Sequence, residues 1–172
     1  MIQHHIITIV GDDRSGLVDS VAKAIKNSGG NWEASRLANL GGKFAGIVNL
    51  SLEQDEISAL ERELGSLRNQ GLQVTLTSHT AVKELDGRKL VVSVVGNDRP
   101  GIVSAVSEEL ANFDINVEEL QTECAPAPMS GEPLFYATAW LTVPENLSES
   151  ELQNALEAIA DDLMIEIDPD DD

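Results

Sequence analysis

The sequence predicts an α+β protein built from two tandem ferredoxin-like units, each with the element order β-α-β-β-α-β and an antiparallel sheet with its helices on one face. Two observations lead to this prediction. Residues 6–33 align with residues 91–118 at a constant offset of 85, with ten identities in 28 positions. In addition, both copies show the same succession of β-branched runs and amphipathic segments.

The repeat also predicts the domain boundaries. We expect a first domain over residues 1–80, a linker over 81–88 and a second domain over 89–168. Residues 169–172 form an acidic tail that ends in three consecutive aspartates, and we expect this tail to be solvated.

In the first copy, the β-branched run Ile6–Val10 predicts a buried strand that stops at Gly11. Apolar side chains from Leu17 to Ile25 recur at helical spacing, and Gly29-Gly30 is suited to end that helix. A hairpin, a second helix and a last strand are expected over residues 32–40, 44–52, 57–67 and 72–78.

The second copy repeats this order. Leu90–Val95 predicts the first strand, and a helix follows in which Pro100 occupies the first turn. Ser148 and Glu151 have the spacing of a capping box at the start of the second helix. The remaining elements are expected over residues 117–124, 135–143, 152–163 and 164–167.

The hairpin of the second copy is longer than that of the first. Ala125–Leu134 adds six residues and carries three prolines. This insertion is suited to contact a partner, because ordered loops often carry recognition, but a merely lengthened hairpin fits the sequence as well.

The turns between the first strand and the first helix are the most suitable places for a ligand. Glycines in Gly11–Gly16 and Gly96–Gly101 allow close approach to the backbone, and the free N–H groups of a helix start attract a carboxylate. Asp13 and Asp98 at the same rim can hold an ammonium group, so each turn suits a zwitterion. The same aspartates can instead cap the helices.

Other polar residues recur at matching positions. Asn31 and Asn116 stand just before the second strand of each copy, where they can either contact a ligand or make turns. Arg14 and Arg99 can orient a carboxylate, although we expect them to be surface residues that pair with neighbouring acids.

The segment from Asp98 to Val103, followed by Asn116, resembles the signature of ACT domains, which are small-molecule-sensing modules. The resemblance covers nearly the whole chain as two tandem ACT units. It implies that a small amino acid, glycine or serine, binds at interfaces between units. The residues it implies for ligand binding are Asp13, Gly16, Leu17 and Asn31, and Asp98, Gly101, Ile102 and Asn116, with Leu17 and Ile102 acting through their backbone N–H groups.

A stand-alone pair of ACT units also resembles small bacterial repressors of glycine cleavage. This resemblance implies a non-enzymatic transcriptional regulator that contacts a LysR-type DNA-binding activator instead of binding DNA itself. The alternative is a regulatory subunit that docks on a separate metabolic enzyme. A homodimer is compatible with both functions.

The charge of the chain excludes several functions and is unevenly distributed. With 11 basic and 30 acidic residues the net charge is −19, which opposes direct binding of nucleic acid. Residues 1–80 carry a net charge of −2, whereas residues 88–172 carry −16. The acidic half either keeps the protein soluble or forms a docking face for a basic partner.

The remaining composition argues against membrane, metal and catalytic roles. The apolar runs are too short to cross a bilayer, and the single Cys124 excludes an intrachain disulfide, so we expect a cytoplasmic protein. His4, His5 and His79 are expected on strand ends, without partners at metal or catalytic spacing. We therefore expect no metal, no cofactor and no catalytic residue.

Overall fold

The computed structural model describes residues 1–79 and 86–170. The chain divides into two compact units, residues 1–83 and 84–172. Most of the expected linker, residues 81–85, lies outside the described residues, and Arg88 at its end already belongs to a strand. Within the described residues, no helix combines the length and the apolar character needed to cross a membrane.

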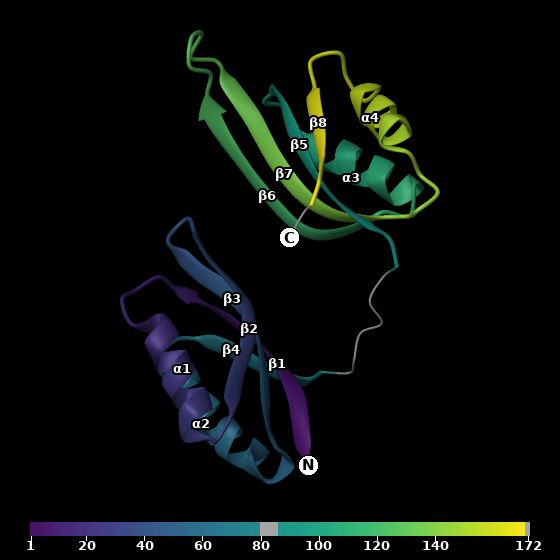
Figure 1. The fold of residues 1–172 in the computed structure, drawn as a ribbon. Coiled ribbons are helices and arrows are strands. Elements are labelled where there is room, and N and C mark those ends of the chain that lie inside the picture. The colour runs from purple at the N-terminus through teal and green to yellow at the C-terminus, as the bar shows by residue number, and fades with distance from the viewer. Residues whose placement is uncertain (80–85, 171–172) are drawn as a thin grey trace. The chain divides into compact units, whose positions relative to one another are not determined.

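The first unit has the predicted order of elements. Its four strands form one antiparallel sheet of order β2-β3-β1-β4, and both helices lie on one face of this sheet (Figure 1). A short 3-10 turn precedes α2. The elements are β1 (Ile2–Asp12), α1 (Leu17–Asn27), β2 (Asn31–Leu40), β3 (Lys43–Glu53), α2 (Ile57–Asn69) and β4 (Gln73–Ser78).

The second unit has the same topology, which confirms the predicted fold. Its antiparallel sheet has the order β6-β7-β5-β8, again with both helices on one face (Figure 1). The elements are β5 (Arg88–Asn97), α3 (Ile102–Asn112), β6 (Asn116–Pro126), β7 (Pro133–Val143), α4 (Glu149–Glu157) and β8 (Met164–Pro169).

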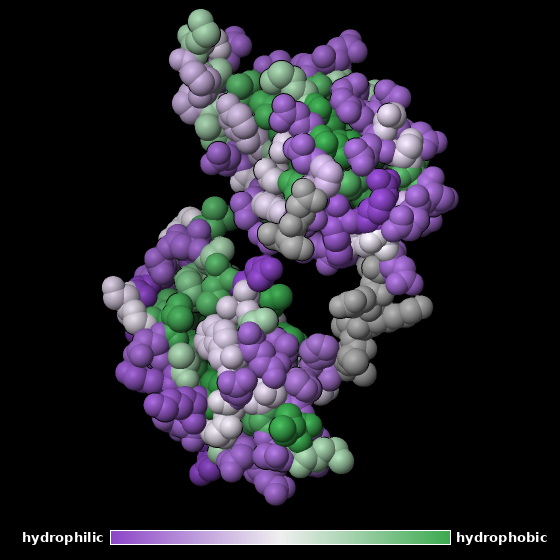
Figure 2. Space-filling model, in the orientation of Figure 1, coloured by the Kyte–Doolittle hydropathy of each residue, from purple (hydrophilic) through white to green (hydrophobic). Residues whose placement is uncertain are grey.

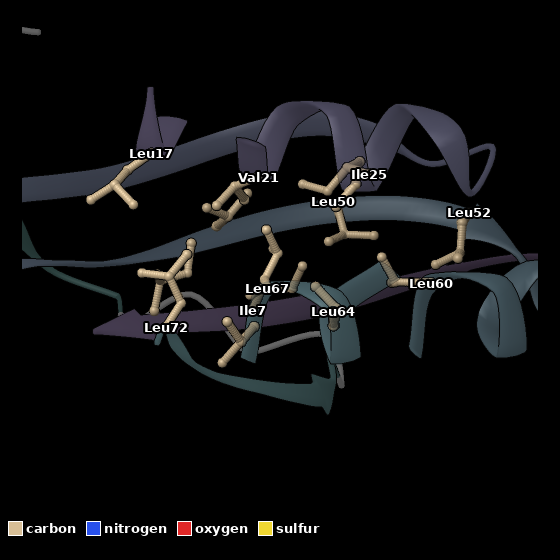
Figure 3. Close-up of a cluster of buried hydrophobic side chains, with 14 residues drawn as sticks. Ile7, Leu17, Val21, Ile25, Leu50, Leu52, Leu60, Leu64, Leu67 and Leu72 are labelled. Carbon is tan, nitrogen blue, oxygen red and sulfur yellow. The ribbon is translucent and has the colours of Figure 1, made fainter. Parts of the chain in front are cut away.

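Each unit has its own core between its helices and its sheet. In the first unit, Leu17, Val21 and Ile25 of α1 point toward the sheet and meet the buried leucines Leu60 and Leu64 of α2 (Figure 3). Alternate residues of β1 and β3 supply the opposite wall of this core. Because a strand alternates its side chains between faces, the other face of the sheet is left without helices.

The helix starts differ from each other as the sequence predicted only in part. Ser148 caps α4 and forms the expected capping box with Glu151. Pro100 is not in the first helical turn of α3, because Gly101, in the left-handed region at φ 95°, forms the N-cap and the helix begins at Ile102. The chain therefore leaves β5 through a turn before it becomes helical.

Two elements end at other residues than the sequence predicted. Helix α4 stops at Glu157 rather than near Leu163, before two aspartates that would be unfavourable at the negative end of a helix dipole. At the carboxyl end, β8 includes Pro169, which lies opposite Leu90, and the N–H of Asp170 donates to the carbonyl oxygen of Lys89 at 3.1 Å. The ordered sheet thus extends into the segment expected to be a tail.

Candidate functional site

The β1–α1 and β5–α3 turns are each tied to the neighbouring hairpin. The N–H of Asp13 donates to the carbonyl oxygen of Gly42 at 2.9 Å, and the N–H of Asp98 donates to that of Pro133 at 3.1 Å. The Asp13 carboxylate accepts a hydrogen bond from the Asn39 amide. These contacts hold both turns close to the tips of the hairpins.

The starts of α1 and α3 have the features expected of a carboxylate site. Gly16 and Gly101 are the N-caps, with φ of 85° and 95°, and no side chain forms a cap hydrogen bond at either. The aspartates therefore do not cap these helices. No atom lies within 4 Å of the position that a Cβ would take at either glycine. The first-turn N–H groups, which include those of Leu17 and Ile102, lack acceptors within their helices.

The other glycines of these turns serve packing within each unit. A Cβ at Gly11 would lie 2.5 Å from Cδ2 of Leu72, and a Cβ at Gly96 would lie 2.5 Å from Cδ2 of Leu163. Because the core leucines fill the space beside them, Gly11 and Gly96 leave no room for a ligand on that side.

The two arginines brace the turns. Nη1 of Arg99 donates to Oδ2 of Asp162 at 2.7 Å, which confirms the expected pairing with a neighbouring acid. The Arg99 hydrogen bond lowers the pKa of the Asp162 carboxyl group, and the N–H of Asn97 donates to the same oxygen at 3.1 Å. Arg14 instead donates to the carbonyl oxygen of Gln70 at 3.4 Å.

The predicted asparagines lie far from the turns of their own unit. Asn31 is the first residue of β2 and lies opposite Ser51, whereas Asp12, which precedes Asp13, lies opposite Lys43. Ser51 and Lys43 are eight residues apart on β3, a separation of about 26 Å along an extended strand. The helix between the turn and the asparagine runs back along the sheet, so one unit does not bring the two together.

The second unit shows the same separation. Asn116 lies opposite Thr142, whereas Asn97 at the turn lies opposite Leu134. The Asn116 amide donates to Oε1 of Glu118 at 2.7 Å. This asparagine is therefore engaged by its own strand.

A polar cluster that the sequence analysis did not single out recurs at the asparagine end. Each unit has a β-bulge at a glutamate, Glu33 or Glu118. A hydrogen bond from Ser51 lowers the pKa of Glu33, and one from Thr142, with Asn116 and Lys89 nearby, lowers that of Glu118. The signal for this cluster was present in the sequence, because Glu33 and Glu118 are among the identities of the repeat.

Cys124 lies exposed near the turn of the second unit. Partial burial of its sulfur raises the pKa of the Cys124 thiol, and a hydrogen bond with Asp98 raises it further. A thiol with a raised pKa is a poor nucleophile, so the contact is consistent with a structural role for this cysteine.

The insertion of the second hairpin is an ordered turn. The N–H of Ala127 donates to the carbonyl oxygen of Glu132 at 2.8 Å, and that of Gly131 donates to Ala127 at 3.0 Å. Met129 at the tip is fully exposed. The structure thus describes a lengthened hairpin, and the contact with a partner stays a prediction.

The three histidines gather at one end of the first sheet. The rings of His4 and His79 lie edge to face with centroids 6.5 Å apart, and Nδ1 of His4 lies 3.2 Å from Oε2 of Glu33. His5 faces the core with 5% of its surface exposed, and neither ring nitrogen has a hydrogen-bond partner. Burial, with smaller contributions from His4 and His79, lowers the pKa of His5.

We expect the substitution His5→Leu to stabilise the first unit and to reduce its sensitivity to acid. Because the pKa of His5 is lower in the folded state, the unfolded chain binds the proton more readily, and stability falls as the pH drops below the ordinary histidine pKa. Removal of two unpartnered buried nitrogens should add about 1 kcal/mol at pH 7.5. Urea unfolding at pH 7.5 and 5.5 measures both effects. The exposed neighbour provides the control: His4→Gln should keep most of the acid sensitivity, and an unchanged pH dependence in His5→Leu would contradict the assignment.

The comparison with protein families gives the class of this protein. The ACT domain family model matches residues 3–77 and 88–123, that is, parts of both units. The chain belongs to the ACT domain family, as the turn residues and the fold of both units predicted.

Particular relatives span the whole chain. It is 25% identical over 169 residues to the glycine cleavage system transcriptional repressor of Escherichia coli (strain K12), which covers 94% of this chain and 86% of the repressor. A protein of unknown function from Galdieria sulphuraria has a solved structure with 34% identity and a TM-score of 0.83, covering 98% of this chain and 99% of that chain. A solved structure of a candidate glycine cleavage system transcriptional repressor has the same fold, with 22% identity and a TM-score of 0.73 over 99% of both chains.

Proposed function

We propose that this protein is a non-enzymatic regulator that senses a small amino acid, with glycine as the first candidate and serine as the second. The observation that carries the proposal is the match of the ACT domain family to both units, together with the similarity of nearly the whole chain to a glycine cleavage system transcriptional repressor. In the proposed role it acts in the cytoplasm on transcription of glycine-cleavage genes.

The proposed ligand site is the start of the first helix of each unit. The ligand carboxylate would bind the backbone N–H groups of Leu17 or Ile102, beside the open Cα of Gly16 or Gly101. Asp13 or Asp98 would receive the ammonium group. Support comes from the absence of a side-chain cap at both helix starts.

Asn31 and Asn116 enter this proposal in a different way. Since each lies at the far end of its own sheet from the turn, it would complete a pocket only where another copy of the chain supplies it. Amino-acid binding would then be coupled to the formation of a homodimer, which sedimentation with and without glycine measures.

We expect glycine to raise the thermal unfolding temperature, because a ligand that binds only the folded state stabilises it by about 2.7 kcal/mol at one hundred times its Kd. Gly101→Val should reduce this shift, since its side chain would fill the open space at the start of α3. Gly131→Val is the matched control, because Gly131 also has a positive φ and open surroundings but lies in the hairpin turn. No shift with any amino acid at millimolar concentration would remove ligand sensing from the proposal.

We further propose that the regulator acts by protein contact, with a LysR-type activator as the candidate partner. The excess of acids in the second unit supports this in preference to direct DNA binding. Pull-down from lysate with and without glycine and serine tests it. Recovery of a metabolic enzyme instead of a transcription factor would favour a regulatory subunit, and a gel shift by the purified protein alone would overturn the proposal.

A further inference from the structure

An apolar groove lies between α3 and β6 in the second unit. It lies on the helix side of the sheet and is lined mainly by aliphatic side chains, of which Val103, Val117 and Leu120 are 40–46% exposed. The space within it is about 30 Å³, which holds about one water molecule and excludes a free metabolite. The groove is thus suited to receive side chains from a surface laid against it.

The first unit fills the equivalent place with its own side chains. Trp32 and Leu37 of β2 pack against the first core, and Leu37 lies so close to Gly46 that a Cβ there would be 2.5 Å from its side chain. By register, the equivalents of Trp32 and Leu37 are Val117 and Thr122. Smaller residues on the edge strand therefore leave the groove open in the second unit.

Strand β6 is also an edge strand, and its two faces differ. It occupies one end of the order β6-β7-β5-β8 (Figure 1), so one side of its backbone has no neighbouring strand within the described part of this unit. Val117, Leu120 and Thr122 line the groove on the helix side. Glu119, Gln121 and Glu123 alternate with them and lie on the opposite face of the sheet.

The acids of this unit exceed its cations. Residues 88–172 contain three basic residues, and each already forms an ion pair within the unit: Arg88 with Glu149, Lys89 with Glu118 and Arg99 with Asp162. Hydrophilic side chains predominate on the visible face of this unit (Figure 2). A partner that approaches β6 therefore meets an acidic surface without competing free cations.

We propose that β6 docks an extended segment of another protein in which apolar and basic residues alternate. Its backbone would pair with the free edge of β6, its apolar side chains would enter the groove, and its basic side chains would face Glu119 and Glu123. The inference rests on the proposed function only in that a regulator needs a contact surface. Peptide binding is measured without amino acid, so its failure would leave ligand sensing untouched.

The test is fluorescence anisotropy of the full chain with labelled peptides. A peptide of alternating valine and lysine should bind more tightly than a peptide of the same composition with all valines before all lysines. Glu119→Lys with Glu123→Lys should weaken binding of the alternating peptide about tenfold or more and should create binding of a valine–glutamate peptide, because the charge match is inverted. Slower amide exchange in residues 116–126 on binding would support strand pairing.

A second variant tests the groove. Val117→Trp with Thr122→Leu copies the first unit and should weaken binding of the valine–lysine peptide while the unit stays folded. Glu145→Lys with Glu157→Lys makes the same change of charge outside β6 and α3 and should bind as the wild type does. Equal binding of both peptides, or equal loss in this control, would reduce the effect to general charge attraction and overturn the proposal. So would a wild-type dimer, seen by sedimentation, that the groove-filling variant dissociates, because the occupant would then be a second copy.

Discussion

The substitution Leu60→Ala is expected to lower the free energy of unfolding of the first unit by about 3–5 kcal/mol and to leave the second unit unchanged. Leu60 is fully buried in the first core, and Leu152, its counterpart in the second core, is also fully buried. The two core clusters share no residue. Leu152→Ala should therefore have the converse effect.

The chain contains suitable reporters for this experiment. Its two tryptophans, Trp32 and Trp140, lie one in each unit, so urea unfolding followed by fluorescence in Trp140→Phe or Trp32→Phe backgrounds observes each unit separately. Val18→Ala and Val103→Ala provide controls at half-exposed helix positions and should cost much less. If one leucine substitution shifted both transitions equally, the units would not unfold as independent bodies.

The sequence predicted the fold because the repeated residues are those that determine its geometry. The glycines at 11 and 96 admit core leucines, and those at 16 and 101 adopt a left-handed backbone at the helix start. These positions are identical in both copies, so two independent segments predicted the same succession of elements. The strand ends were less predictable, because polar residues such as His4 and Asp12 extend a strand as readily as they end it.

The candidate site was predicted only in part. Local sequence was sufficient to place the helix starts, since the turn and the helix are neighbours in the chain. The distance between Asn31 and the turn depends on the path of α1, which returns along the sheet and separates residues that share a motif. Recurrence at matching positions thus indicated equivalent places in two units, but it did not show that these places adjoin within one.

The groove was not predictable from either copy alone. Leu37 and Thr122 are equivalent, and so are Gly46 and Ala137, but these equivalences follow from the register between strands. An exchange of a large residue over glycine for a smaller residue over alanine changes how far the edge strand closes over the core. This difference involves two residues that are distant in the sequence and adjacent across the ladder.

The substitution Gly46→Ala should destabilise the first unit by about 3 kcal/mol. A Cβ at position 46 would lie 2.3 Å from the carbonyl oxygen of Arg36 and 2.5 Å from the Leu37 side chain. The side chain can turn away, but the carbonyl belongs to the neighbouring strand, so the ladder between β2 and β3 must shift. Urea unfolding in the Trp140→Phe background measures the loss.

The second unit contains the matched control. Ala137 holds the position equivalent to Gly46 and faces Thr122, so Ala137→Gly relieves no clash and should cost only about 1 kcal/mol, the usual penalty of glycine in a strand. If Gly46→Ala were as mild, the close approach of Leu37 would not be what closes the first unit. A large loss that Leu37→Ala does not reduce would place the strain at the Arg36 carbonyl. The closed groove of the first unit would then depend on the backbone of β2 as well as on the size of its side chains.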